Sequence, residues 1–245
     1  FADTRGTLFF DVVRILEANR PRAFFLVNVK QLVSHDDGKT FKVILERLQR
    51  LGYFVHFKVL NGLDFGVPQK RERIMLVGFL GNHPFKFPQR GEGPFLSLKD
   101  VLEPDHEIDK KYFLSEKMRK QLKERGVKAK FRPSVWHQNK SGNIGIHPFS
   151  CALRANASYN YLLVNGERRF TPREMLRLQG FPDSYKIVLS DHEVRKQCGN
   201  SVVVPQIQSV AKAMVEAMRS APVPAIVQSG LFEMPIEAIK QTAYA

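Results

Sequence analysis

The feature that most constrains the fold is a pair of strand-like runs joined by a short connection without a helix. Residues 53–60 and 73–79 are rich in apolar, aromatic and β-branched side chains, which is typical of strands. Gly66 and Pro68 lie between them and interrupt any helix there. Parallel neighbours need a long crossover connection, so two strands this close in the sequence are predicted to pair antiparallel.

The residues before this pair alternate between helix and strand patterns. Residues 7–19 have helical spacing and end before Pro21, and residues 40–51 form a second amphipathic pattern that ends at Gly52. Between them, residues 23–29 (AFFLVNV) form a continuous apolar run, which predicts a strand buried on both faces of a parallel sheet. This order predicts half of a doubly wound α/β sheet.

Composition restricts the partners. A net charge of +14 and a pI near 9.9 favour a polyanion, with nucleic acid first, although an acidic lipid surface is also compatible. No apolar run is long enough to span a bilayer and no signal-peptide pattern is present, so we expect no membrane partner. Cys151 and Cys198 make no metal-ligand spacing, so we expect no metal and a reducing cytoplasm.

Residues 81–166 change character, because prolines interrupt them and periodicity is scarce. Positions 117–140 hold nine Lys or Arg residues and one acid, with Phe131, Trp136 and His137 interleaved. Composition alone is equally typical of a solvated loop and of a DNA-docking surface, in which cations meet phosphates and planar groups meet bases. The candidate DNA-binding residues are Lys117, Lys120, Lys123, Arg125, Lys128, Lys130 and Arg132.

Five polar residues stand at the start of the strand predicted at 73–79, namely Gln69, Lys70, Arg71, Glu72 and Arg73. Two arginines two positions apart on an extended strand point to the same face. Such a pair of guanidinium forks suits an oxyanion, which includes a phosphate, a carboxylate or a base carbonyl. The alternative interpretation is a solvated, salt-bridged strand end.

Later segments return to regular structure. Short helices are predicted at residues 114–124 and from Pro172 to Leu178. Gly199, Asn200 and Ser201 precede an apolar helical pattern at 203–218, where helix-start amides can hold a small polar ligand. Spacing alone favours an ordinary N-cap formed by Asn200 or Ser201.

Four segments resemble, in the right order, the DNA (cytosine-5) methyltransferases. GVPQKRERIMLVGF resembles motif VIII, RFTPREMLRLQGFPDSYKI motif IX and QCGNSVVVPQI motif X, and DTRGTLFFDVVRILEANRPRAFFLVNVKQL is similar to the segment that includes motif VI. Three long ordered motifs make a far more specific signal than one short pattern, and together the segments cover about half of the chain.

The resemblance implies an α/β fold, a partial S-adenosylmethionine-dependent (Rossmann-like) methyltransferase sheet with a small, irregular target recognition domain. Residues 1–80 are expected to form the second half of the catalytic domain and 81–166 the target recognition domain. Residues 167–220 are expected to return to the catalytic domain, and 221–245 to form a tail without an assigned function. The apolar run at 226–231 is expected to pack against the body.

The resemblance also implies the chemistry and the residue roles. A cysteine thiolate adds to C6 of a flipped cytosine, the methyl group passes from S-adenosylmethionine to C5, and a base removes the C5 proton. Gln69 matches the first position of motif VIII, Arg73 is expected near the base carbonyl, and Arg71 near a phosphate or the active-site acid. The residues implied to line the S-adenosylmethionine pocket are Asn200, Ser201 and Val202.

The sequence departs from the family at three points. It has no Pro-Cys dipeptide, and the family's nucleophile and Gly-rich cofactor turn are expected upstream of the first residue. The family's Glu-Asn-Val reads Val-Asn-Val, so Val27 occupies the position of the acid that holds N3 of cytosine, followed by Asn28. Cys151 and Cys198 are interpreted as small packed thiols rather than replacement nucleophiles.

We therefore expect part of a DNA methyltransferase that acts on C5 of a cytosine in a specific duplex sequence and is inactive alone. Its expected partners are double-stranded DNA and an N-terminal half or partner chain that carries the Pro-Cys and Gly-rich segments. The resemblance also implies a bacterial cytoplasm, with the protein at the nucleoid. One alternative is a non-catalytic DNA-binding relative or a split-enzyme subunit, the former favoured by Val27. Another is a methyltransferase that acts on RNA cytosine.

Overall fold

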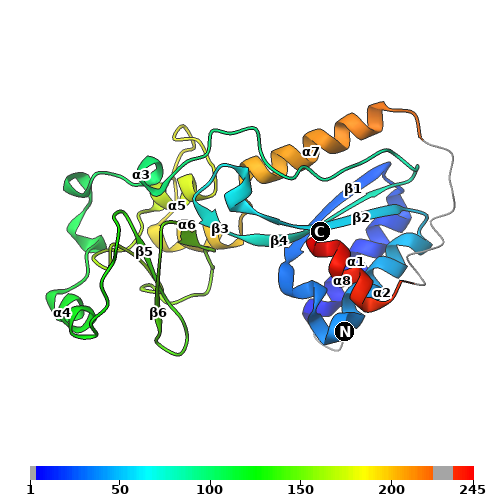
Figure 1. Ribbon diagram of the computed structural model, residues 1–245. Helices are drawn as coiled ribbons and strands as arrows, with labels where there is room; N and C mark the ends of the chain where they lie inside the picture. The colour runs from blue at the N-terminus through cyan, green and yellow to red at the C-terminus, as the bar shows by residue number, and fades with distance from the viewer. Residues whose placement is uncertain (1–3, 223–233) are drawn as a thin grey trace. The chain divides into compact units, whose positions relative to one another are not determined.

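The computed structural model describes residues 4–222 and 234–245, with side chains from Leu8 onward (Figure 1). The chain forms two compact units, of which unit 1 comprises residues 1–60, 72–89 and 210–245, and unit 2 comprises residues 61–71 and 90–209. The predicted division into catalytic, recognition and tail segments is one of role and stays a prediction. The apolar run at 226–231 lies outside the described residues.

Unit 1 is an α/β structure built on a three-stranded sheet in the order β1-β4-β2. β4 (Glu72–Phe79) runs antiparallel to β1 (Ala23–Val29), and β2 (Phe54–Asn61) is its other neighbour. The two late strands therefore do pair, and the antiparallel direction of that pair stays a prediction. The helices of unit 1 are α1 (Thr4–Asn19), α2 (Lys39–Arg50), residues 210–219 of α7 (Val204–Arg219) and α8 (Ile236–Tyr244), with 3-10 helices at Lys30–Val33 and His35–Gly38.

The core of unit 1 follows from the helical periodicity of α2. Its apolar residues Phe41, Ile44, Leu45 and Leu48 are all buried on one face and join a cluster with residues of the sheet and of α8. Figure 1 shows α8 beside α2, although the two are far apart in the sequence. Burial of each such side chain stabilises the fold by about 1.5–3 kcal/mol.

The predicted burial of β1 on both faces is wrong. Phe24 is its only buried residue, and its one partner in the described sheet, β4, runs antiparallel to it rather than parallel. Phe24 lies opposite Gly78, and a Cβ at position 78 would approach the Phe24 ring to 2.2 Å. The glycine therefore leaves room for the ring that covers it.

Unit 2 has two small sheets. β3 (Gln69–Lys70) pairs parallel with β7 (Ser150–Cys151), and β5 (Val135–Gln138) lies antiparallel between β6 (Ile144–His147) and β8 (Leu162–Val164). The α-helices are α3 (Leu98–Val101), α4 (Glu116–Glu124), α5 (Pro172–Leu178), α6 (Asp191–Asn200) and the first turn and a half of α7 (Val204–Arg219), which continues in unit 1. The 3-10 helices are Gly62–Phe65, Asp105–Glu107 and Lys110–Tyr112.

The helix starts of unit 2 have clear local causes. The Ser115 side chain caps α4, and Thr171 and Glu174 form a reciprocal capping box around Pro172 at the start of α5. Both predicted helices are thereby confirmed. The N-cap interpretation of Asn200 and Ser201 is wrong, because Asn200 ends α6, Ser201 is its C-cap, and α7 begins only at Val204.

A buried ion pair fixes the chain before α5. Arg168 is 2% exposed and donates to both Glu174 oxygens, at 3.0 and 2.9 Å, and to Asp105 at 2.7 Å. Glu174 also accepts from the backbone N–H groups of Glu103 and Thr171. Because every partner is hydrogen-bonded, the network tolerates burial, whereas a single unpaired charge there would be costly.

No helix among the described residues is both long and apolar enough to cross a bilayer.

Candidate functional site

Gln69 is fully buried and connects three segments of unit 2. Its Nε2 donates to the Leu178 carbonyl at 2.8 Å and to Gln179 Oε1 at 3.3 Å, and its Oε1 accepts from the backbone N–H of Leu153 at 3.0 Å. The parallel pairing of β3 with β7 brings the side chain to this position. The amide thus uses both its donor and its acceptor within the protein.

Arg71 is 3% exposed and binds the backbone of Leu153 at its carbonyl, whereas Gln69 binds the N–H. Its guanidinium donates to the carbonyl of Leu153 at 2.9 Å, to that of Gly199 at 3.0 Å, and to that of Ser201. Gln69 therefore binds the N–H of Leu153 and Arg71 binds its C=O. We name Gln69, Arg71 and the Leu153 backbone the clamp.

The clamp continues into the residues around α6. The Gln179 side chain donates to the Cys198 carbonyl at 2.6 Å, and the Gln179 backbone carbonyl accepts from the backbone N–H of Val204 at 2.8 Å. Gly199 lies so close to the chain that an added Cβ would meet Ala155 N at 2.1 Å. The segments singled out as motifs VIII, IX and X are thereby brought together within unit 2.

The three predicted cofactor residues follow directly after this region. Asn200 is exposed, Ser201 is half-buried and Val202 is 36% exposed. Neither the Asn200 amide nor the Ser201 hydroxyl has a hydrogen-bond partner among the described residues. They offer donors and acceptors beside an apolar side chain, which is the mixture that small-molecule sites use. Among the described residues no three His, Cys, Asp or Glu side chains gather as metal ligands.

Cys198 is 1% exposed, and burial raises the pKa of its thiol to about 11. Cys151 is half-buried, and burial likewise raises the pKa of its thiol. A raised pKa removes the thiolate that a nucleophile needs. The interpretation of both residues as packed thiols therefore fits their surroundings.

The remaining predicted catalytic residues belong to unit 1. Arg73 lies opposite Val29 in the β1/β4 ladder, and Val27 lies opposite Met75. Side chains alternate along a strand, so Val27 and Arg73 share one face of the sheet and Asn28 lies on the other. Arg73 donates to its neighbour's carbonyl at 2.8 Å, and burial lowers the pKa of its guanidinium.

The two arginines do not belong to one continuous strand. β3 ends at Lys70, β4 begins at Glu72, and Arg71 lies between them. The alternation of side chains along a strand therefore does not apply across Arg71. It gives no reason to expect the side chains of Arg71 and Arg73 on one face. Joint use of both guanidinium groups by one anion stays a prediction.

All seven candidate DNA-binding residues are exposed. Arg125 donates to the Gly142 carbonyl at 2.6 Å, Arg132 pairs with Glu167 at 2.6 Å, and Lys120 lies 4.0 Å from Glu124. The other four have no ion pair or hydrogen bond among the described residues, and they are Lys117, Lys123, Lys128 and Lys130. Exposed and unpaired, these four can meet phosphates at little cost.

One predicted base-facing residue is misplaced. Trp136 is 9% exposed and packs with Leu114 and Leu163, so it is part of the core and the interpretation as an exposed planar group is wrong. β5 is the central strand of its sheet, and Trp136 lies opposite Ile146 of β6 and Leu163 of β8, which flank it. Phe131 is 40% exposed and keeps the predicted position at the surface.

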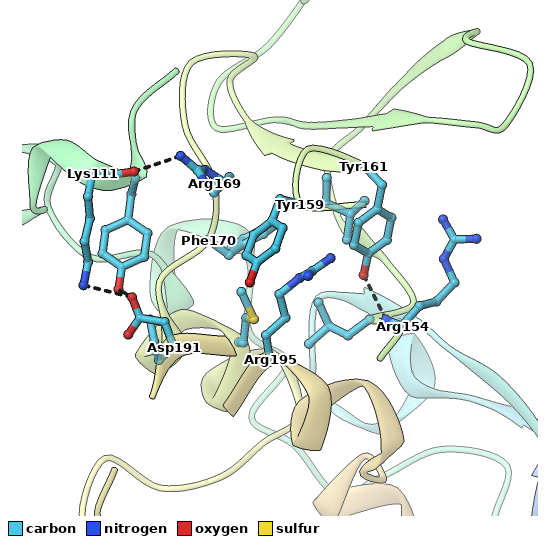
Figure 2. Close-up of a pocket in the computed structure, with 13 residues that line it drawn as sticks. Lys111, Arg154, Tyr159, Tyr161, Arg169, Phe170, Asp191 and Arg195 are labelled. Atoms are coloured by element: carbon cyan, nitrogen blue, oxygen red, sulfur yellow. Dashed lines mark hydrogen bonds and ion pairs between the residues drawn. The ribbon is translucent and has the colours of Figure 1, made fainter. Parts of the chain in front are cut away.

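Sequence reasoning missed a pocket in unit 2 that is lined by tyrosines and cations, including Tyr159, Tyr161, Arg154 and Arg195 (Figure 2). The only local signal was the Tyr-Asn-Tyr sequence at 159–161. The cations come from two other segments, one of them α6, so no linear pattern joins them.

Comparison with known proteins adds a family and a fold. Residues 1–216 match the family described as C-5 cytosine-specific DNA methylase. The chain is 53% identical over 212 residues to the Type II methyltransferase M.NgoBI of Neisseria gonorrhoeae, which covers 86% of this chain and 67% of that protein. It is 52% identical over 221 residues to the Type II methyltransferase M.HaeII of Haemophilus aegyptius, and this match covers 90% of this chain and 69% of that protein.

Solved structures give the same fold at lower identity. The S. pombe Dnmt2 methyltransferase matches with a TM-score of 0.63 at 20% identity, over 90% of this chain and 75% of that one. The Entamoeba histolytica methyltransferase EhMeth matches with a TM-score of 0.63 at 16% identity, over 89% and 71%. At these identities the likeness concerns the fold alone.

Proposed function

Because the chain belongs to the family of C-5 cytosine-specific DNA methylases, we propose that it carries the recognition segment and base-facing residues of an enzyme that methylates C5 of a cytosine flipped out of a specific duplex sequence. Enzymes of this family methylate cytosine in DNA with S-adenosylmethionine as the methyl donor. The clamp carries the proposal, since it ties the backbone of Leu153 to the segment before α7.

Residues 200–202 fit part of a site for the methyl donor. When bound, S-adenosylmethionine supplies a methyl group on a positively charged sulfur. The Asn200 amide and the Ser201 hydroxyl would orient its polar groups, and Val202 would cover an apolar part. Arg71 would act as a positioning residue, because it holds the carbonyl of Ser201 and that of Gly199.

Arg73 is the residue that we assign to the base carbonyl. Its one hydrogen bond in the described structure goes to the Glu72 carbonyl, so other N–H groups of the fork are available. Val27 shares its face and offers no group that could hold N3 of cytosine. Loss of an acid in such a position typically costs about 10²–10⁴-fold in rate.

The exposed cations at 117–132 are proposed to meet the phosphates of double-stranded DNA, which would place the protein at the nucleoid. The chain contains no Pro-Cys dipeptide. We therefore propose that it transfers no methyl group unless an N-terminal half or partner chain supplies that segment.

Reconstitution tests this proposal. The N-terminal part of M.HaeII is added to the chain, and methyl transfer from labelled S-adenosylmethionine to duplex DNA is measured. We expect no transfer by the chain alone, and Val27→Glu should raise the rate of the mixture about 10²-fold or more. No transfer by the Val27→Glu mixture would contradict the proposal.

Arg73→Ala, introduced into the Val27→Glu mixture, should reduce transfer at least about tenfold, because a charged hydrogen bond to the base is lost. Arg50→Ala, an exposed change at the end of α2, is the control and should leave the rate unchanged. An equal rate in Arg73→Ala and the control would remove Arg73 from the site.

A second candidate function is DNA binding without catalysis, and Val27 is the observation that favours it. A gel shift with duplex DNA that persists while the Val27→Glu mixture transfers no methyl group would support this second function.

A further inference from the structure

Unit 2 contains a cavity of about 220 Å³ that the proposed chemistry does not use (Figure 2). Its aromatic walls are Tyr112, Tyr159, Tyr161 and Phe170. The volume lies below the ~300–1,000 Å³ of sites for drug-sized ligands, so a single ring system fits it better than a whole dinucleotide or cofactor.

The only carboxylate in the lining is already neutralised. Asp191 accepts from the Tyr112 hydroxyl at 2.6 Å and from Lys111 at 2.9 Å, and these bonds, that of Tyr112 first, hold the pKa of Asp191 below its usual value. Burial and the bond to Asp191 raise the pKa of Tyr112 to about 12. The acid therefore offers little to a cationic ligand.

Two arginines lie over the tyrosine rings. Arg195 is buried, donates to the carbonyls of Ala157 and Ser158, and lies 4.3 Å from the centre of the Tyr159 ring. Figure 2 shows its side chain between Tyr159 and Tyr161. These bonds fix the loop that carries Tyr159.

Arg154 differs from Arg195 because it is exposed. Its guanidinium lies 4.7 Å from the centre of the Tyr161 ring and has no acid or carbonyl partner among the described residues. Its backbone N–H donates to the Tyr161 hydroxyl at 2.9 Å, which fixes the base of the side chain. A positioned, unpaired guanidinium at the mouth of an aromatic cavity suits an anion attached to a planar ring.

From this combination we infer that the cavity accepts one unstacked base of the DNA substrate, with the phosphate of that nucleotide on Arg154. Aromatic side chains stack on bases and arginine binds phosphate, which is how single-stranded nucleic acid is held elsewhere. The inference rests on the proposed action on DNA. The base is not the methylated cytosine, because none of the predicted catalytic residues lines the cavity.

Leu153 links the cavity to the clamp. It lines the cavity and is held at its N–H by Gln69 and at its C=O by Arg71. A base in the cavity would therefore contact Leu153, whose backbone is fixed by Gln69 and Arg71.

The test compares two duplexes that differ by one unpaired, bulged nucleotide. A bulged base has already lost its pairing, so a site for an unstacked base should favour it. The chain should bind the bulged duplex about tenfold more tightly or better, which is the typical effect of stacking one base. No methyl transfer is involved, so the result is independent of the catalytic proposal.

The variants are Arg154→Gln and Tyr159→Leu, both at exposed positions outside the predicted catalytic set. Each should reduce the preference for the bulged duplex to less than about threefold and leave the affinity for the plain duplex within about twofold. Lys196→Gln removes one charge from an exposed site on α6 outside the cavity and should keep the preference.

Equal affinity for the two duplexes, or a preference that survives both variants, would overturn the inference. If neither duplex binds, the proposed action on DNA fails, and deoxyadenosine monophosphate becomes the probe. The inference then falls as well if that nucleotide does not bind, or binds the variants as tightly as the unchanged chain.

Discussion

Leu153 is held through its main chain, by the amide of Gln69 and the guanidinium of Arg71. Arg71 supplies charged donors to three carbonyls, and each such bond typically contributes about 1.5–3 kcal/mol. Removal of Arg71 has the larger effect, since each buried carbonyl left without a donor has lost its hydration without gaining a hydrogen bond. Arg71 is therefore expected to matter for stability as well as for function.

Arg71→Met should lower the free energy of unfolding by about 3 kcal/mol or more, because it keeps the apolar stem and removes every donor. Arg71→Lys should recover only part of that loss, since an ammonium has no fork. Urea unfolding measures both, with Arg50→Met as an exposed control. A loss in Arg71→Met no larger than the control's would show that the clamp is not stabilising.

The raised pKa of Cys198 leads to a prediction about reactivity. With a pKa of about 11 the residue is almost entirely thiol at pH 8, and it is also buried. In a Cys151→Ser chain, iodoacetamide should therefore label folded Cys198 at least about 10²-fold more slowly than in urea. Equal rates would show an accessible thiolate and reopen its role as a nucleophile.

At the scale of elements, the sequence predicts best where the cause is local. The apolar spacing of α2 and the Thr171, Pro172, Glu174 pattern of α5 each predict a helix, and both helices are present. The break between β3 and β4 was not predicted, because it depends on Arg71 turning to carbonyls of distant residues. Backbone acceptors have no sequence signature.

The start of α5 also depends on the buried pair of Arg168 and Glu174. Glu174→Gln removes the charge that compensates Arg168 and should lower the free energy of unfolding by about 3–5 kcal/mol. Glu167→Gln breaks a partly exposed pair with Arg132 and should cost about 1 kcal/mol or less. Thermal and urea unfolding of the two variants compare the sites, and equal losses would contradict the buried-pair argument.

At the scale of the whole molecule, the sequence predicts the α/β class, the reversed strand and the family, because long ordered motifs carry them. It predicts less about the site. Trp136 was assigned to the surface from its basic surroundings, yet its sheet position buries it. The cavity lined by Arg154 and Arg195 was missed, since tertiary packing alone brings these residues together.

The net charge of +14 should make binding to DNA depend strongly on salt. Replacement of the four unpaired lysines (Lys117, Lys123, Lys128 and Lys130) by Gln should reduce the slope of log K against log salt by up to about 3.6, at about 0.9 for each phosphate contact. The control is a variant in which four other exposed lysines (Lys39, Lys86, Lys99 and Lys196) are replaced by Gln. Equal slopes in the two variants would leave the basic run a solvated loop.

The grip on Leu153 through its amide and carbonyl has a consequence for how such proteins diversify. At position 153, Gln69 and Arg71 bind only the backbone N–H and C=O, which every residue there would provide, except that proline has no N–H. If the residues beyond it contact DNA as proposed, they could change while these two bonds stay intact. A change of target sequence would then require no change in Gln69 or Arg71.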